Sequence, residues 1–332
     1  MTAGSANIRR NIRRWWRLIQ PLFLLLALVF IALLLVNQWS ELRSHTWRMA
    51  PGWLALSGLL MLAGWCVEVW LWRAALAGLG GRLNYADALG IWFASILVRY
   101  IPGNVWQPLG MTVLARQRGV RVEATVGSIA LFQAVNLLSV LPIAGVYLLT
   151  VGDLGLLAPW LGGATKWLAA AAGLIIAFFL LRPGWLIGLL NWALTKAGRD
   201  RLDARLATGQ LIRLLWVATV AWLCWGSSFA AITFGLTVYT VGEMSAALPH
   251  LLAAFPMAYA VGYLSFVTPS GLAVREGALY LLLAPVLGGG PTTVAALAIR
   301  LWQVILEVVV AGSFWLWTRG RQSQDAPSGQ KE

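Results

Sequence analysis

Charged residues are scarce in this sequence. Asp, Glu, Lys and Arg make up only 11% of its 332 residues, whereas 60% are hydrophobic, and the mean hydropathy is +0.75. A soluble protein of this length needs far more polar side chains to cover its surface. Long apolar runs recur from Leu18 almost to Trp317. Lipid is therefore the expected solvent, and we predict an all-α, polytopic helical membrane protein.

Patterns that bind metals or carry out catalysis are also lacking. Cys66 and Cys224 fall within apolar runs, and His45 and His250 stand alone without partners at ligand spacing. We find no phosphate-binding glycine loop and no nucleophile elbow. The sequence therefore predicts no metal, no cofactor and no enzymatic activity.

Six apolar runs approach or exceed the roughly 20 residues that a helix needs to cross a membrane. They are about Leu18–Val36, Trp53–Leu76, Ala124–Thr150, Thr165–Leu181, Leu211–Thr240 and Thr293–Trp317. The first run follows a basic stretch and ends without a small-residue cleavage site, so we predict an uncleaved signal anchor.

Two further apolar regions are broken by Pro and Gly, which interrupt helices. Their arms are Ala86–Val98 with Val105–Ala115, and Leu248–Val267 with Ala273–Leu287. Most of these arms are too short to cross, so we predict two re-entrant helical hairpins. Broken backbone at membrane depth is tolerated only when it is buried in protein or lines a cavity.

The basic residues test this topology. Three fall at predicted membrane depth and three in external loops, and the remaining 19 of 25 fall on the other side, which the positive-inside rule makes cytoplasmic. The net charge of +13 then reflects orientation in an inner (plasma) membrane, and no nucleic-acid partner is expected. The bias requires hairpins of opposite orientation and cytoplasmic termini. Treating each arm as a full span also keeps both termini inside.

The two hairpins predict an inverted repeat. Pro102 and Pro269 are 167 positions apart, and the same offset aligns polar residues of the helices that follow, Gln133 with Arg300 and Asn136 with Gln303. A span, a hairpin and a span repeated in opposite orientation is the plan of many transporters. The predicted single domain covers 1–320, with inverted halves at roughly 53–150 and 211–317, and the polar tail 321–332 is predicted to be disordered.

A polar stripe marks the last span. Arg300, Gln303 and Glu307 are spaced i, i+3, i+7 and share one helix face. Charges in a span cost a few kcal/mol or more unless they are paired or hydrated, so the stripe should face the protein interior. It is either a structural network that joins helices or a path for a headgroup or a proton.

Arg275 and Glu276 begin the helix after the second break. A carboxylate suits the positive N-terminal end of a helix, and an arginine does not. Arg275 therefore needs an anionic partner, either Glu307 or a ligand. Free backbone N–H groups, a helix N-terminus and an arginine together make an anion site, so we favour a functional role.

Five other polar residues are candidates at membrane depth. Arg99 ends the first arm of hairpin one, where a cation is favourable, and Asn104 follows the break. Gln133 and Asn136 share a face, for which hydrogen bonding between helices is the favoured reading. Glu68 is a lone carboxylate that is protonated, paired with an arginine or coupled to protons, and the sequence leaves these alternatives open.

Three stretches are distinctive: Arg99-Tyr-Ile-Pro-Gly-Asn-Val-Trp106 in the first hairpin, Thr268-Pro-Ser-Gly-Leu-Ala-Val-Arg-Glu-Gly277 in the second, and Ala298-Ile-Arg300-Leu-Trp302 in the last span. These stretches resemble the flippase-like membrane domain of lysylphosphatidylglycerol synthases, and the resemblance covers roughly Leu18 to Trp317. It implies a lipid-translocating domain whose hairpins meet near the midplane, with Arg275, Glu276 and Arg300 in a cavity. Gln133 stands where the family often has an acid. The soluble aminoacyl-transferase domain of full synthases is absent, so lipid aminoacylation by this chain alone is not expected.

Three functions remain open at this point. The leading hypothesis is a flippase-like transporter that moves a phosphate-bearing lipid, anionic or aminoacylated, between leaflets, with such membrane lipids as its partners. The alternative is the membrane subunit of a lipid-linked glycosyl or aminoacyl transferase system, which requires a separate soluble transferase. The third is a structural membrane scaffold.

Overall fold

The computed structural model describes residues 36, 39–44, 46–97, 106–196, 198–265, 271 and 273–324. In these ranges the regular structure is helical, apart from one isolated antiparallel bridge between Trp47 and Thr237. The α-helices are α2 (Trp39–Ser44), α3 (Pro51–Gly78), α4 (Tyr85–Ile96), α5 (Trp106–Arg116), α6 (Val122–Thr150), α7 (Ala158–Leu161), α8 (Thr165–Leu181), α9 (Gly184–Lys196), α10 (Thr208–Leu236), α11 (Val241–Leu264), α12 (Val274–Leu287) and α13 (Gly289–Gln324). The 3₁₀ turns η2 (Gly155–Leu157) and η3 (Gly162–Ala164) flank α7.

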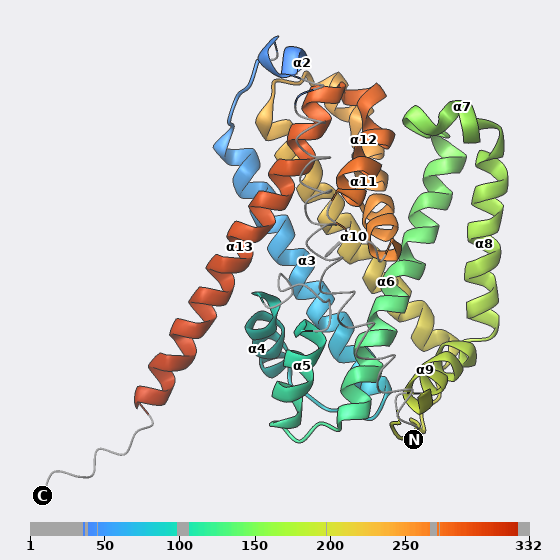
Figure 1. Ribbon diagram of the computed structural model, residues 1–332, viewed down its shortest axis with the longest axis vertical. Helices are drawn as coiled ribbons and strands as arrows, with labels where there is room; N and C mark the ends of the chain where they lie inside the picture. The colour runs from blue at the N-terminus through green and yellow to red at the C-terminus, as the bar shows by residue number, and fades with distance from the viewer. Residues whose placement is uncertain are drawn as a thin grey trace, which may run out of the picture.

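Long helices run between the two ends of the molecule (Figure 1). Helices α3 and α10 form its most extensive pair. Fully buried Ser57 and Ser228 join them, because the Ser228 hydroxyl donates to the Ser57 carbonyl at 2.8 Å and the two hydroxyl oxygens lie 2.9 Å apart. Small polar side chains let membrane helices approach closely and hydrogen-bond at the contact.

Among the residues that the structure describes, five helices are long and apolar enough to cross a membrane, namely α3, α6, α10, α11 and the Gly289–Ser313 part of α13. Helix α8 passes the same test only together with the bent segment Gly155–Leu161. The prediction of an all-helical protein with several apolar spans is therefore confirmed. The predicted signal anchor, Leu18–Val36, lies outside the described residues apart from Val36.

Helix α11 is longer than the predicted arm Leu248–Val267. It begins at Val241, because Thr240 and Glu243 form a capping box in which the Glu243 side chain accepts from the Thr240 backbone N–H at 2.7 Å. Its 24 residues reach spanning length, although Pro249 lies inside it. Neighbouring helices tolerate such a proline by satisfying the freed backbone groups. The predicted start of this arm at Leu248 was therefore too late.

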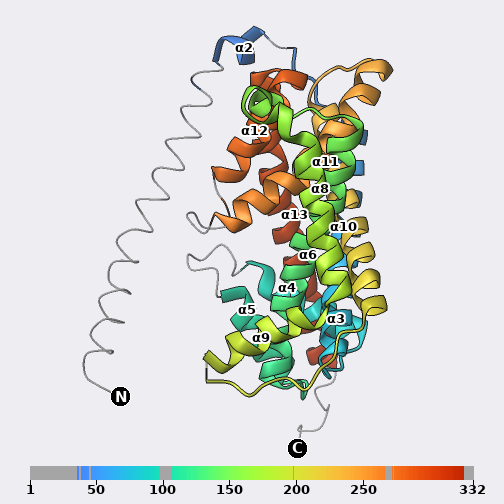
Figure 2. The same ribbon diagram turned by 90° about the vertical axis from the view of Figure 1, so that its right-hand side faces the viewer.

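Short helices occupy opposite halves of the molecule. Helices α4 and α5, of 12 and 11 residues, pack together in the lower half of Figure 1, and the 14-residue α12 packs on α11 in the upper half. Figure 2 shows the same separation from the side. The two breaks, 98–105 and 266–270, lie outside the described residues, so the re-entrant inverted repeat stays a prediction.

Basic connections share one end of the molecule. The α5–α6 turn, with Arg116, Arg118 and Arg121, lies at the same lower end of Figure 1 as α9, which Lys196 ends. Helix α9 buries Leu186, Ile187, Leu190 and Leu194 against the protein and exposes Trp185, Leu189 and Trp192. An amphipathic helix with aromatic residues outward suits the membrane interface.

One glycine, at the end of the molecule opposite α9, permits the close packing of η2 against α12. Gly155 has a φ of +57°, and a Cβ built on it would lie 2.3 Å from the carbonyl oxygen of Leu281.

We expect Gly155→Ala to lower the thermal unfolding temperature in detergent, since the left-handed backbone alone costs about 1–2 kcal/mol. Gly163→Ala is the control, because nothing lies within 4 Å of its added Cβ. Equal unfolding temperatures for the two variants would contradict this packing.

Candidate functional site

A cavity of about 420 Å³ opens among the helices. Its walls come from α3, α4, α5, α6, α10, α11, α12 and α13, so both halves of the chain contribute. Five of the nine predicted site residues line it: Gln133, Asn136, Arg275, Arg300 and Gln303. Glu276 and Glu307 are not among its lining residues, and Arg99 and Asn104 lie outside the described residues.

An ion pair joins α12 to α13 at the cavity wall. Nη1 of Arg300 lies 2.6 Å from Oε1 of Glu276, and the two side chains are 22% and 4% exposed. Glu276 stands in the first turn of α12, where a carboxylate is favoured by the helix dipole. Its other oxygen, Oε2, is buried without a hydrogen-bond partner among the described residues. Glu276 therefore holds Arg300 from behind the cavity wall.

Aromatic rings of α11 hold Arg275. Its guanidinium carbon lies 4.4 Å from the ring centroid of Phe255 and 5.7 Å from that of Tyr259, and the residue is only 8% exposed. A cation over a ring face is stabilised most when water is excluded. The chain can approach this closely because Gly262 and Gly271 face each other: a Cβ on Gly271 would lie 3.0 Å from the Gly262 backbone.

The predicted polar stripe of α13 divides into two parts. Arg300 and Gln303 line the cavity, whereas Glu307 is fully buried and does not. Nε2 of Gln303 donates to Oε1 of Glu307 at 2.8 Å. Gln303 thus connects the cavity surface to a carboxylate inside the protein.

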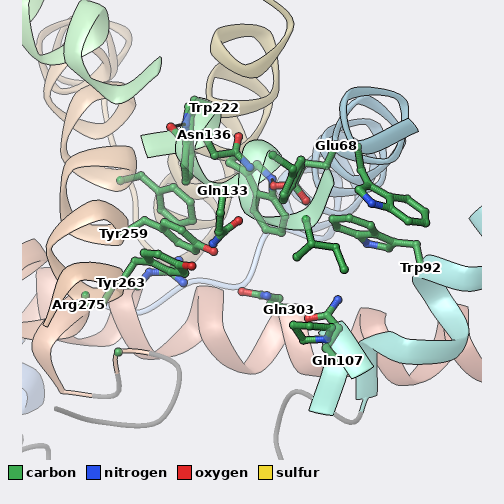
Figure 3. A pocket seen from close by; sticks show the side chains of 18 of the residues that line it. Glu68, Trp92, Gln107, Gln133, Asn136, Trp222, Tyr259, Tyr263, Arg275 and Gln303 are labelled. Atoms are coloured by element: carbon green, nitrogen blue, oxygen red, sulfur yellow. Dashed lines mark hydrogen bonds between the residues drawn. The ribbon is translucent and has the colours of Figure 1, made fainter. Parts of the chain in front are cut away.

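Two amide side chains of α6 face the cavity (Figure 3). Gln133 lies in the cavity lining together with Tyr263 of α11. The indole N–H of Trp222 donates to the backbone carbonyl of Asn136 at 3.0 Å. Oδ1 of Asn136 is buried without a partner among the described residues. The α6 face therefore offers an acceptor that the described protein does not use.

The sequence argument missed the aromatic walls and left Glu68 without an assignment. Glu68 lines the cavity, and its Oε1 accepts from the indole N–H of Trp225 at 3.2 Å. The lining also includes Trp72, Trp92, Phe132 and Trp222. The available signal was position, because Trp92, Phe132 and Trp222 lie inside apolar runs instead of at their ends, where interfacial tryptophans gather.

One comparison with known proteins gives a match. The family model described as the lysylphosphatidylglycerol synthase TM region matches residues 20–311. This match confirms the resemblance that the hairpin stretches carry. No curated protein matches the sequence.

The ion pair between α12 and α13 should be needed for stability. We expect Glu276→Gln to lower the free energy of unfolding by about 3 kcal/mol, because it leaves Arg300 as a largely buried cation, 22% exposed, without its partner. Glu276→Gln with Arg300→Met should recover much of this loss. Denaturant titration in mixed micelles measures both.

The exposed pair of Arg118 and Asp87, 2.8 Å apart, supplies the control. Arg118→Met should change the free energy of unfolding by about 1 kcal/mol or less, since exposed pairs contribute little. A single Glu276 variant as stable as the wild type, or a double variant as unstable as the single one, would refute a stabilising pair.

Proposed function

Since the chain belongs to the lysylphosphatidylglycerol synthase transmembrane family, we propose that it moves a phosphate-bearing lipid, anionic or aminoacylated, between membrane leaflets. The family indicates a membrane function related to lipids, and the cavity supports the more specific activity. The observation that carries the proposal is the placement of Arg275, a cation that is only 8% exposed and lines a cavity among the long apolar helices.

A phosphate suits this position for two physical reasons. Arg275 stands in the first turn of α12, where backbone N–H groups have no partner within the helix and the dipole favours an anion. A guanidinium also forms two parallel hydrogen bonds to phosphate oxygens. Phe255 and Tyr259 fix the guanidinium plane, so less side-chain freedom is lost when a phosphate binds.

The arrangement of short helices suggests how the cavity reaches both leaflets. In our proposal α4 with α5, and α11 with α12, are hairpins that enter from opposite sides, as in inverted-repeat transporters. The cavity lies between them, because α4, α5, α11 and α12 all contribute to its walls. Small opposite movements of the hairpins would open it to one leaflet at a time.

Charge gives the proposed orientation. The connections at the α9 end carry Arg116, Arg118, Arg121, Arg182, Lys196, Arg199, Arg201 and Arg205, and those at the α7 end carry Arg43, Arg48 and Lys166. By the positive-inside rule, the α9 end and both termini then face the cytoplasm. The protein lies in the inner membrane in this proposal.

The alternative is the membrane subunit of a lipid-linked glycosyl or aminoacyl transferase system. The family takes its description from a synthase, which favours this alternative. The alternative requires a separate soluble transferase as partner. Deletion of the gene separates the two proposals. Under the transport proposal, the lipid persists but accumulates in one leaflet. Under the alternative, the product lipid disappears.

Replacing Arg275 should impair transport without unfolding the protein. We expect Arg275→Gln to lower the inter-leaflet rate of an anionic phospholipid by about tenfold or more in reconstituted vesicles, because a charge-assisted phosphate contact contributes roughly 1.5–3 kcal/mol. Fluorescently labelled lipid and a membrane-impermeant quencher measure the rate.

Arg213→Gln is the matched control, since the guanidinium carbon of Arg213 also lies over an aromatic ring, 5.0 Å from the Trp70 ring centroid, but the residue does not line the cavity. This variant should transport at the wild-type rate. Wild-type rates equal to those of empty vesicles for every anionic and zwitterionic lipid would end the transport proposal. A scaffold would instead show lower stability and unchanged lipid distribution in Arg275→Gln.

A further inference from the structure

Helix α9 carries a groove on its exposed face, outside the cavity described above. Trp185, Leu189 and Trp192 are spaced i, i+4, i+7 and share one side of the helix, and Gly184 and Gly188 leave gaps between them. These five residues line a groove of about 590 Å³. The three large side chains are 63%, 61% and 57% exposed. An exposed apolar surface of this kind indicates an interaction site.

The opposite side of α9 fixes the groove in place. The side-chain amide of Asn191 donates to the carbonyl of Leu202 at 3.0 Å, and its Oδ1 accepts from the N–H of Leu202 at 2.8 Å. Gly127 of α6 admits this packing, since a Cβ added to it would lie 2.6 Å from a methyl carbon of Leu202 and 3.1 Å from one of Leu190. In Figure 2, α9 runs across the direction of the long helices at the lower end of the molecule. The groove is therefore formed before any ligand binds.

Two cations stand at the C-terminal end of the groove. Nζ of Lys196 lies 4.4 Å from the ring centroid of Trp192, so the ammonium borders a ring that lines the groove. Arg201 reaches the same end of the helix, because its Nε donates to Oγ1 of Thr195 at 3.3 Å. Neither cation forms an ion pair within the part of the chain that the structure describes. The groove thus combines an apolar floor with positive charge at one end.

The chain around the groove is basic as well. From Arg182 to Arg205 it contains five basic and two acidic residues, and one of the bases, Arg199, pairs with Glu123 of α6 at 3.5 Å. This excess favours an occupant with negative charge. A second copy of the chain that used the same face would bring its own basic segment to the contact, and like charges disfavour such a pair. A soluble anion would leave the tryptophans uncovered.

We propose that the groove binds one anionic phospholipid from the leaflet at the α9 end. Its phosphate lies at Lys196 and Arg201, and its glycerol and first acyl carbons lie over Gly188, between Trp185 and Trp192. Charge-assisted hydrogen bonds from both cations suit a phosphate. An amphipathic helix with basic and aromatic residues lies at the boundary between headgroups and acyl chains, where both parts of a phospholipid are within reach. This site is separate from the cavity and does not depend on the transport proposal.

Lipid binding to the purified full chain tests the proposal. The protein is titrated in detergent with phosphatidic acid, phosphatidylcholine or the soluble anion glycerol 3-phosphate, and native mass spectrometry counts the molecules that each protein retains. Lys196→Gln removes a cation, and its control is Lys166→Gln, beside the 77% exposed Trp167 at the α7 end. Gly188→Leu fills the groove, and its control is Gly173→Leu on α8. A Cβ added to either glycine has nothing within 4 Å.

We expect the wild type, Lys166→Gln and Gly173→Leu to retain one phosphatidic acid that Gly188→Leu lacks. Lys196→Gln should raise the apparent Kd for this molecule about fivefold, because a basic residue near an anionic headgroup contributes to lipid binding by this much. Leucine is a better helix former than glycine, so Gly188→Leu should unfold at the wild-type temperature or above. Loss of the lipid from this variant then reflects the filled groove.

Three results would overturn the proposal. The first is phosphatidylcholine or glycerol 3-phosphate bound as tightly as phosphatidic acid. The second is a Gly188→Leu protein that retains as many phosphatidic acid molecules as the wild type. The third is a wild-type dimer that Gly188→Leu converts to a monomer, because a second copy would then cover the groove. Binding in the cavity is common to all variants, so none of these results bears on the transport proposal.

Discussion

The ion pair between Glu276 and Arg300 is the interaction on which the rest of the site depends. Ionic groups in an apolar segment cost several kcal/mol unless they are paired, so a helix that carries them must turn them inward. The pair, 2.6 Å apart, connects the start of α12 to the middle of α13. It thereby fixes the depth at which α12 begins. Arg275, one residue before Glu276, is placed by the same contact.

The aromatic contacts of Arg275 complete this arrangement from the other side. Phe255 and Tyr259 are one turn apart on α11, and both rings lie within 6 Å of the guanidinium carbon. Helix α11 can reach α12 because Gly262 and Gly271 leave no side chain between their backbones. Substituting either glycine would separate the two helices, and the arginine would lose its rings. The ion pair of Glu276 with Arg300 thus sets the depth of Arg275, and the close backbone packing at Gly262 and Gly271 sets the direction of its side chain.

Hydropathy was sufficient to predict most of the long helices, because lipid requires apolar runs of a defined length. It set the start of α11 too late, at Leu248, because the capping box of Thr240 and Glu243 is a local hydrogen-bonding signal that hydropathy does not include. The polar residues of the cavity were also found from sequence, since an amide or a charge is conspicuous in an apolar run. The aromatic residues that form its walls were not found. A tryptophan in a span has the same local pattern whether it faces lipid, a core or a cavity, and only the packing of α3, α6 and α10 decides among these.

The stripe on α13 shows that one sequence pattern can serve two purposes. From spacing alone, Arg300, Gln303 and Glu307 were either a structural network or a path for a headgroup or a proton. In the folded chain Glu307 is fully buried and accepts from Gln303, so its contact is internal to the protein. Gln303 and Arg300 line the cavity, but each is also bound to a carboxylate behind the wall. Loss of either side chain would disturb packing and ligand contact together. Arg275 and Glu68 are therefore the more informative positions, because each lines the cavity and is contacted there by aromatic side chains, Arg275 by Phe255 and Tyr259 and Glu68 by Trp225.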